Sequence, residues 1–317
     1  MIKKKPLVVI DFPIRRSMGL GNLLFIWARG VAYAHRYNLD YHTKTWFKIY
    51  FFKSFFLSRW ERRVYFTSFK RKTNYRKYIY CYCFGKKIIE PSFSAEPDLS
   101  KPSLLFFRDI PEYWHYFRDI KPFRAHIIWA LNAMLHKKVW SDIEQQPEPV
   151  IAVHIRHGDF PVADKNLPFK KQGQRRTPMD YFIKLIDKIR NISGYCLPVT
   201  IFTDGKVEDL KEVLALPQTN LARSRKYDIS DIILMSKSKL LIVSAGSTFS
   251  FWGGFLGNMP IINHFEHLHE DLRDKKTNDL WFEGGVDPDS DEKSWPALLI
   301  KNIKDIDAHQ AKNLEKP

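Results

Sequence analysis

The second half of the chain alternates short apolar runs with amphipathic segments, and this alternation constrains the fold more than any other feature. Val150–Ile155 is a nearly continuous apolar run, typical of a parallel strand covered on both faces. Similar runs occur at Pro198–Phe202, Lys239–Val243 and Pro260–Asn263. The segments predicted to be helical are Met179–Ile189, Lys206–Leu214, Ile229–Met235 and Ser247–Leu256. The pattern predicts a doubly wound α/β domain, in which ligands bind beyond the carboxyl ends of the strands.

The first half begins in the same way. Leu7–Phe12 reads as a strand, and a helix is expected over Leu23–Tyr37 with a glycine-containing turn between them. A further helix is expected at Ile127–Leu135, whereas residues 44–100 give no clear pattern. The polar, proline-containing stretch Gln145–Pro149 indicates a linker, so we expect two domains, residues 1–147 and 148–317.

The composition excludes several classes of protein. A hydrophobic content of 44% and a charged content of 27% are ordinary for a globular protein, not for a disordered or collagen-like chain. There is no apolar run of about 18 residues for a membrane span, and the apolar stretch after the basic N-terminus is too short for a signal peptide. Three cysteines, Cys81, Cys83 and Cys196, indicate a reducing compartment and neither a disulfide framework nor a zinc site.

Most of the net charge of +16 lies in residues 44–87. This segment has a single acid, Glu61, and is rich in Trp, Phe and Tyr. Three interpretations stand: a solvated basic face over an aromatic core, a contact with anionic lipid headgroups, or a surface for single-stranded nucleic acid. The bases are Lys44, Lys48, Lys53, Arg59, Arg62, Arg63, Lys70, Arg71, Lys72, Arg76, Lys77, Lys86 and Lys87.

Candidate site residues follow the predicted strands of the second domain. His154 and Arg156 share one face of the first strand, because side chains alternate along a strand. An arginine at a buried strand end needs an anion, which is either Asp159 or a ligand phosphate held by the guanidinium fork. After the next strand, Asp204 either caps a helix or accepts hydrogen bonds from a base or ribose.

The third strand is followed by the small residues Ser244-Ala245-Gly246-Ser247-Thr248, which lead into a predicted helix. Small residues allow close approach of a ligand to the backbone, and a helix N-terminus attracts anions. Ser247 or Thr248 could equally be an ordinary N-cap. Three such features at successive strand ends together favour a phosphate-bearing nucleotide.

Five blocks of the sequence, in order, resemble those of the α-1,2-fucosyltransferases, which form glycosyltransferase family 11 within the wider fucosyltransferase group. They lie between about residue 17 and residue 263, while residues 40–145 carry no match. The blocks are Gly19-Leu20-Gly21-Asn22, His154-Ile155-Arg156-His157-Gly158-Asp159, Phe202-Thr203-Asp204, Asp231-Ile232-Ile233-Leu234-Met235-Ser236 and Ser247-Thr248-Phe249-Ser250-Phe251-Trp252-Gly253-Gly254-Phe255-Leu256.

The resemblance implies a GT-B-type fold of two Rossmann-like domains facing across a cleft, with GDP-fucose as donor, inversion at the sugar carbon and no metal ion or other cofactor. It implies that Arg156 binds the β-phosphate, and that Asp204 lies near the nucleotide. His154 and Asp159 would be motif positions with a positional role. The remaining donor-binding positions implied are Ser247, Thr248 and Phe249 in the second domain, and Gly21 and Asn22 in the first.

Some positions depart from the family pattern. His157 stands where a second arginine is frequent, and Met18, Leu23 and Phe251 also differ. These departures leave open a different acceptor, or a donor carrying another GDP-linked deoxysugar. Two further possibilities are a nucleotide-binding protein without catalytic activity and a nucleic-acid-binding protein.

The sequence identifies residues that could stabilise the leaving diphosphate, but not the general base that takes the proton of the acceptor. Asp287-Pro288-Asp289 matches the metal-binding Asp-x-Asp pattern, but no strand is predicted before it, so we interpret it as a solvated loop. Arg156 and helix-end amides can stabilise the leaving diphosphate instead. No general base is assigned, Asp11, Asp159 and Glu112 being candidates only as carboxylates.

The expected partners follow from both halves of the chain. The second domain would bind the nucleotide sugar, and the first would lie on the acceptor side. We expect a cytoplasmic enzyme held peripherally on the inner face of a bacterial plasma membrane through residues 44–87. Its acceptor would be the galactose-type hydroxyl of a surface glycan (lipopolysaccharide or capsule) or of a lipid-linked precursor, and nucleic acid is the less favoured partner.

Overall fold

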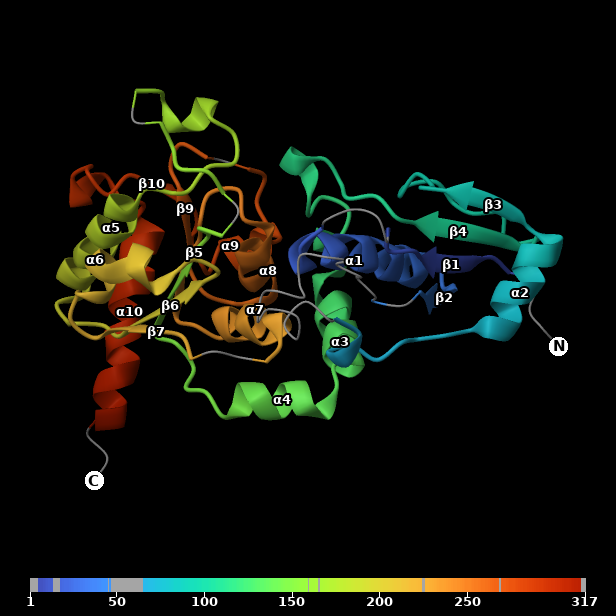
Figure 1. The fold of residues 1–317 in the computed structure, drawn as a ribbon, viewed down its shortest axis with the longest axis horizontal. Helices are drawn as coiled ribbons and strands as arrows, with labels where there is room; N and C mark the ends of the chain where they lie inside the picture. Colours follow the sequence, from blue (N-terminus) through green and yellow to red (C-terminus); the bar gives the residue numbers. More distant parts are fainter. Residues whose placement is uncertain are drawn as a thin grey trace. The chain divides into compact units, whose positions relative to one another are not determined.

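A computed structural model describes residues 5–13, 18–44, 46, 65–158, 160–164, 166–223, 226–267 and 269–314 (Figure 1). The chain divides into two compact units, unit 1 (Met1–Gln145 with Arg225–Ser230) and unit 2 (Gln146–Ser224 with Asp231–Pro317). The first boundary lies close to the one expected at 147/148, but residues 225–230 return to unit 1. None of the helices in the described ranges has the length and apolar character needed to cross a bilayer.

Unit 1 contains a parallel sheet of four strands in the order β2-β1-β4-β3. All four residues of the central strand β1 (Leu7–Ile10) are buried, which explains its uninterrupted apolar sequence. The strand pairs with β2 (Asp40–Thr43) on one side and β4 (Ser103–Phe107) on the other, while β3 (Lys86–Ile89) forms an edge.

The helices of unit 1 include the two expected from the sequence. The predicted first helix is confirmed as α1 (Leu20–Arg36), which begins three residues earlier than predicted, and the second is α3 (Arg124–Met134). Region 44–100, unassigned from sequence, contains α2 (Tyr75–Phe84) and β3; residues 47–64 lie outside the described ranges. The remaining helical segments are η2 (Tyr65–Thr67), η3 (Tyr113–His115), η4 (Lys121–Phe123) and α4 (Lys137–Glu144).

Unit 2 contains a parallel sheet of six strands in the order β10-β9-β8-β5-β6-β7. The predicted strands are confirmed as β5 (Ile151–Ile155), β6 (Val199–Thr203), β8 (Leu240–Ile242) and β9 (Ile261–His264). The strands β7 (Thr219–Leu221) and β10 (Glu283–Val286) extend the sheet at its two edges. The α/β class with a parallel sheet in each half is confirmed, and two such units are the components of a GT-B-type fold.

Amphipathic helices cover the sheet of unit 2. α5 (Met179–Ser193) buries a stripe that includes Phe182, Leu185 and Ile189 against β5 and β6, as its periodicity predicts. The helix predicted over 206–214 forms as a 3₁₀ turn, η6 (Val207–Leu210), followed by the single turn α6 (Lys211–Leu214). The other helices are η5 (Phe169–Lys171), α7 (Asp228–Ser236), α8 (Thr248–Leu256), α9 (Lys275–Asn278), η7 (Glu292–Ser294) and α10 (Ala297–Leu314).

Candidate active site

Three adjacent strands of unit 2 end at one edge of the sheet and bring the sequence-predicted residues together. β5 pairs in parallel with β6 on one side and with β8 on the other. The register aligns Ile155 with Thr203, so the next residues, Arg156 and Asp204, emerge side by side. In a parallel sheet this edge is where ligands bind.

Arg156 and Asp204 form an ion pair between guanidinium Nη1 and carboxylate Oδ2. Oδ1 of the same carboxylate accepts hydrogen bonds from the backbone amides of His157, at 3.0 Å, and Gly158, at 2.9 Å. The Arg156 guanidinium also lies over the ring of Phe160, 5.3 Å from its centroid. Both paired side chains are about a quarter exposed, so the pair borders solvent and is accessible from it.

This arrangement excludes a helix-capping role for Asp204. The following 3₁₀ turn begins at Val207 with Lys206 at its N-cap, so Asp204 is not the cap residue. Burial raises the pKa of Asp204, but the Arg156 guanidinium and the backbone amides outweigh it and hold this pKa below its usual value. The carboxylate is therefore ionised near neutral pH and supplies the anion that Arg156 requires. Asp159, which the sequence offered as that anion beside a ligand phosphate, lies outside the described residues.

Hydrogen bonds from side-chain hydroxyl groups link the strand ends to one another. Ser244 Oγ accepts from the Arg156 amide at 2.8 Å and donates to the His154 carbonyl at 2.7 Å. Thr203 Oγ1 donates to the Ile155 carbonyl at 2.7 Å. Thr177 Oγ1, just before α5, accepts from the Ala245 amide at 3.0 Å. Sequence reasoning missed these roles, because each links segments that become neighbours only once the strand order is known.

The N-terminus of α8 lies at the same edge. Gly246 has φ of +68°, a left-handed conformation that favours glycine, and it turns the chain from β8 into the helix. Ser247 occupies the N-cap position, but its side chain makes no capping hydrogen bond. The first amides of α8 are therefore not satisfied by Ser247 in the ordinary way, which leaves the helix N-terminus suited to an anion.

His154 stacks against Phe249 from the first turn of α8, with 5.3 Å between ring centroids and an interplanar angle of 29°. His154 is almost completely buried, and burial lowers its pKa to about 4. Within the described part of the chain its Nδ1 has no hydrogen-bond partner. The imidazole is therefore neutral at pH 7 and packs β5 against α8.

The candidate residues of unit 1 lie in and around the turn that follows β1. Gly21 and Asn22 belong to the first turn of α1, and Oδ1 of Asn22 is buried with no partner among the described residues. Asp11 pairs with Lys44 at 3.0 Å and with Arg108 at 2.6 Å. Glu112, by contrast, is exposed.

The sequence-based reason for setting aside Asp287-Pro288-Asp289 was wrong in one respect. A strand, β10, directly precedes this segment and pairs in parallel with β9. The motif lies three strands from β5, or about 14 Å at about 4.8 Å per strand. Asp289 is 67% exposed and pairs with Lys184 at 2.9 Å, so one of the two carboxylates already has a cationic partner.

The model of the family described as "Glycosyl transferase family 11" matches residues 49–277, well over half of the sequence. No curated protein matches the chain.

Similar solved structures include the fucosyltransferase NodZ from Bradyrhizobium, at 12% identity and a TM-score of 0.48, with 81% of this chain and 94% of that one covered. A mutant of Arabidopsis thaliana FUT1 in complex with GDP shows 14% identity and a TM-score of 0.42, with 86% and 72% covered. POFUT1 in complex with GDP-fucose shows 11% identity and a TM-score of 0.40, with 81% and 97% covered.

Proposed function

Because the chain belongs to glycosyl transferase family 11, we propose that it transfers L-fucose from GDP-fucose, with inversion, to a galactose-type hydroxyl in α-1,2 linkage. The observation that carries the proposal is the meeting of β5, β6 and β8 beside the N-terminus of α8. There an accessible arginine, a helix N-terminus and a glycine turn surround one sheet edge.

The leaving group sets the chemical requirement. As the bond between fucose and GDP breaks, negative charge grows on the β-phosphate. The guanidinium of Arg156 and the first amides of α8, which Thr248 and Phe249 provide, are donors of the kind that stabilises such charge. Ser247 and Gly246 keep the backbone close to the diphosphate, because neither places a large side chain over the helix N-terminus.

Asp204 acts on this site through Arg156. It fixes the guanidinium and, through its bonds to the His157 and Gly158 amides, the turn after β5. A Cβ atom on Gly158 would overlap the Asp204 carboxylate, so the turn requires glycine for lack of space. We therefore assign Asp204 as a positioning residue next to the nucleotide. His154 has a positional role through Phe249, and Asp159 keeps the positional role that the motif implies.

Gly21 and Asn22 keep the donor-binding role that the family motif implies. Oδ1 of Asn22 is buried with no partner among the described residues, so it is a hydrogen-bond acceptor suited to a hydroxyl of the donor. The general base is unassigned. Two ion pairs occupy Asp11, Glu112 is exposed, and Asp159 lies outside the described residues.

The proposed reaction uses no divalent metal, since Arg156 and α8 supply the charge that a metal would otherwise provide. Support comes from the position of Asp287-Pro288-Asp289 near the far edge of the sheet, with Asp289 bound to Lys184. The acceptor is proposed to be a surface glycan or its lipid-linked precursor. The chain would act as a peripheral protein on the inner face of a bacterial plasma membrane, with residues 44–87 as the contact.

A donor panel tests the proposal. Purified protein is incubated with GDP-fucose, other GDP-deoxysugars, GDP-mannose and UDP-galactose, with and without EDTA, and release of nucleotide and transfer to a β-galactoside are measured. We expect GDP-fucose to be used preferentially, with the rate unchanged by EDTA. Preference for another GDP-deoxysugar would reassign the donor. Binding of GDP without turnover would make the chain a non-catalytic nucleotide-binding protein.

A further inference from the structure

Helix α2 of unit 1 turns an apolar and aromatic stripe outward. Tyr75, Ile79 and Tyr82, at spacings of four and three residues, lie on one face and are 53%, 60% and 53% exposed. A helix on the surface of a globular protein normally presents polar residues there. The outward face of α2 is therefore unusual for a surface in contact with water alone.

The orientation of α2 is fixed by its buried face. Lys77 is buried and its ammonium group binds the carboxylate of Asp40 at 2.9 Å. One turn later, Cys81 packs into an apolar cluster with Leu7 and Leu104 of the sheet. A rotation that hid the outward stripe would expose this cluster and break the ion pair.

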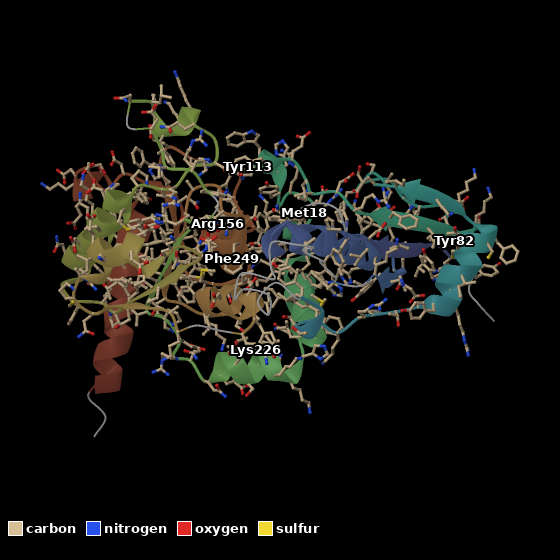
Figure 2. All side chains as sticks on the ribbon, in the orientation of Figure 1. Met18, Tyr82, Tyr113, Arg156, Lys226 and Phe249 are labelled. Atoms are coloured by element: carbon tan, nitrogen blue, oxygen red, sulfur yellow. The ribbon has the colours of Figure 1, made fainter. Side chains whose placement is uncertain are left out.

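Further exposed apolar side chains follow the stripe at the end of α2 and on the edge strand β3. Phe84 at the end of α2 is 73% exposed, and Ile89, on the face of β3 that is turned to α2, is 57% exposed. The ammonium group of Lys87 lies 3.7 Å from the centroid of the Tyr82 ring and so joins strand to helix. We call these residues the α2–β3 surface: Arg71, Tyr75, Arg76, Ile79, Tyr82, Phe84, Lys87 and Ile89. Tyr82 marks it in Figure 2.

The charge around this surface has one sign. Between residues 70 and 89 the sequence has seven basic residues and no acidic one. Lys77 is neutralised by Asp40, and Lys70 and Lys72 contact Ala133 and Tyr41 instead. The cations of the α2–β3 surface are Arg71, which bonds the Tyr75 hydroxyl, the exposed Arg76, and Lys87 over the Tyr82 ring.

We propose that the α2–β3 surface docks on an anionic lipid bilayer, with α2 lying along the membrane plane. Aromatic and aliphatic groups would enter the interface while the surrounding cations meet anionic headgroups, the usual composition of interfacial helices. The biological purpose of this docking, which is to bring the enzyme to a lipid-linked acceptor, rests on the proposed function. The docking itself requires only unit 1.

The surface fits a bilayer better than it fits other partners. Single-stranded nucleic acid stacks its bases on aromatic rings, but Ile79 and Ile89 offer no ring. A second copy of the same surface would place its cations against like charges with no acid on the surface to pair them, which disfavours self-association. A lipid surface satisfies both the apolar groups and the charge.

Native cysteines allow a direct test. Cys83 is exposed on α2 and Cys196 is exposed in unit 2, whereas Cys81 is buried. An environment-sensitive dye is attached to Cys83 in a Cys196→Ser protein and, as the matched control, to Cys196 in a Cys83→Ser protein. With vesicles of phosphatidylglycerol and phosphatidylcholine, we expect a blue shift and brighter emission at Cys83 and no change at Cys196. Unchanged emission at Cys83 would overturn the proposal.

Charge reversal provides the second arm. Each basic residue near an anionic surface raises membrane affinity about fivefold, so the Arg71→Glu, Arg76→Glu, Lys87→Glu variant should bind these vesicles at least about 100-fold more weakly. The control Lys170→Glu, Lys171→Glu, Lys275→Glu makes the same change of net charge on exposed residues of unit 2 and should bind normally. Lys77 is left intact because its reversal would break the buried pair.

The remaining outcomes separate docking from catalysis. Equal loss of binding in both charge variants would overturn the proposal, as would tight binding of a single-stranded oligonucleotide at physiological salt without vesicle binding. The α2–β3 variant should still transfer sugar to a short soluble acceptor. If the wild type binds vesicles but transfers nothing to that acceptor, the docking stands and the proposed function fails.

Discussion

Replacing Arg156 by lysine is expected to lower kcat about 10²–10³-fold. Arginine has five N–H donors in a planar fork, so Arg156 can bind Asp204 through Nη1 and present further donors to a phosphate. Lysine keeps the charge but is a single point donor. Loss of one donor aimed at charge that develops in the transition state costs about 2.7–4 kcal/mol, which corresponds to this range.

The assay is the initial rate of fucose transfer at saturating GDP-fucose, with far-ultraviolet circular dichroism and thermal unfolding as checks on folding. KM for the donor should rise less than kcat falls, because the interaction is strongest when the β-phosphate carries its full charge. Arg36→Lys, the same substitution at an exposed residue at the end of α1, serves as the control and should leave kcat unchanged. A folded Arg156→Lys protein with near-normal kcat would refute the assignment.

Three further predictions concern unit 2. Gly158→Ala should lower the rate of fucose transfer at least about tenfold in a folded protein, because the added methyl group would displace the Asp204 carboxylate from Arg156. Normal activity would contradict the close contact between Gly158 and Asp204. Burial lowers the pKa of His154 to about 4, so the unfolded state takes up the proton first, and urea unfolding should show stability falling by up to about 1.4 kcal/mol per pH unit from about pH 6.5 to 4. A His154→Gln protein should lose that part of the pH dependence, and an unchanged profile would argue against a buried neutral imidazole. Glu283→Ala should lower the free energy of unfolding by about 3–5 kcal/mol, because it leaves the buried Arg273 without its carboxylate partner. Glu148→Ala removes a half-exposed pair with Lys237 and should lower the free energy of unfolding by under about 1 kcal/mol. Equal losses would contradict the difference in burial between the two ion pairs.

The elements that local sequence predicts well are those whose burial follows a regular pattern along the chain. Every residue of β5 is buried, so its sequence is an uninterrupted apolar run. α5 buries one face only and shows the matching period. Small residues before α8 likewise indicate the turn that Gly246 makes with positive φ.

The elements that sequence reasoning missed depend on contacts distant in sequence. β10 has the sequence Glu-Gly-Gly-Val, with little apolar character, and its Glu283 is buried because Arg273, ten residues earlier, binds it at 3.1 Å. β3 is an edge strand whose four residues are all exposed, so burial imposes no pattern on it. Neither strand could be recognised from its own residues.

The candidate site was predictable residue by residue but not as a set of contacts. Arg156 and Asp204 were each identified at a strand end, yet their ion pair spans 48 positions and requires β5 and β6 to be neighbours. Consecutive strands often pair, so the sequence contained a signal for this contact. The Ser244 bridge had no such signal, because it depends on β8 inserting on the other side of β5.

The most direct test of the central claim is the configuration of the product. EDTA-treated protein is supplied with GDP-fucose and a β-galactoside acceptor, and the glycan formed is analysed by nuclear magnetic resonance. We expect fucose joined in α linkage to the 2-hydroxyl of galactose, formed without metal and about 10²–10³-fold more slowly by Arg156→Lys. The proposed function would be contradicted if the folded protein formed no fucosylated product, or if product appeared only after Mg²⁺ or Mn²⁺ was restored.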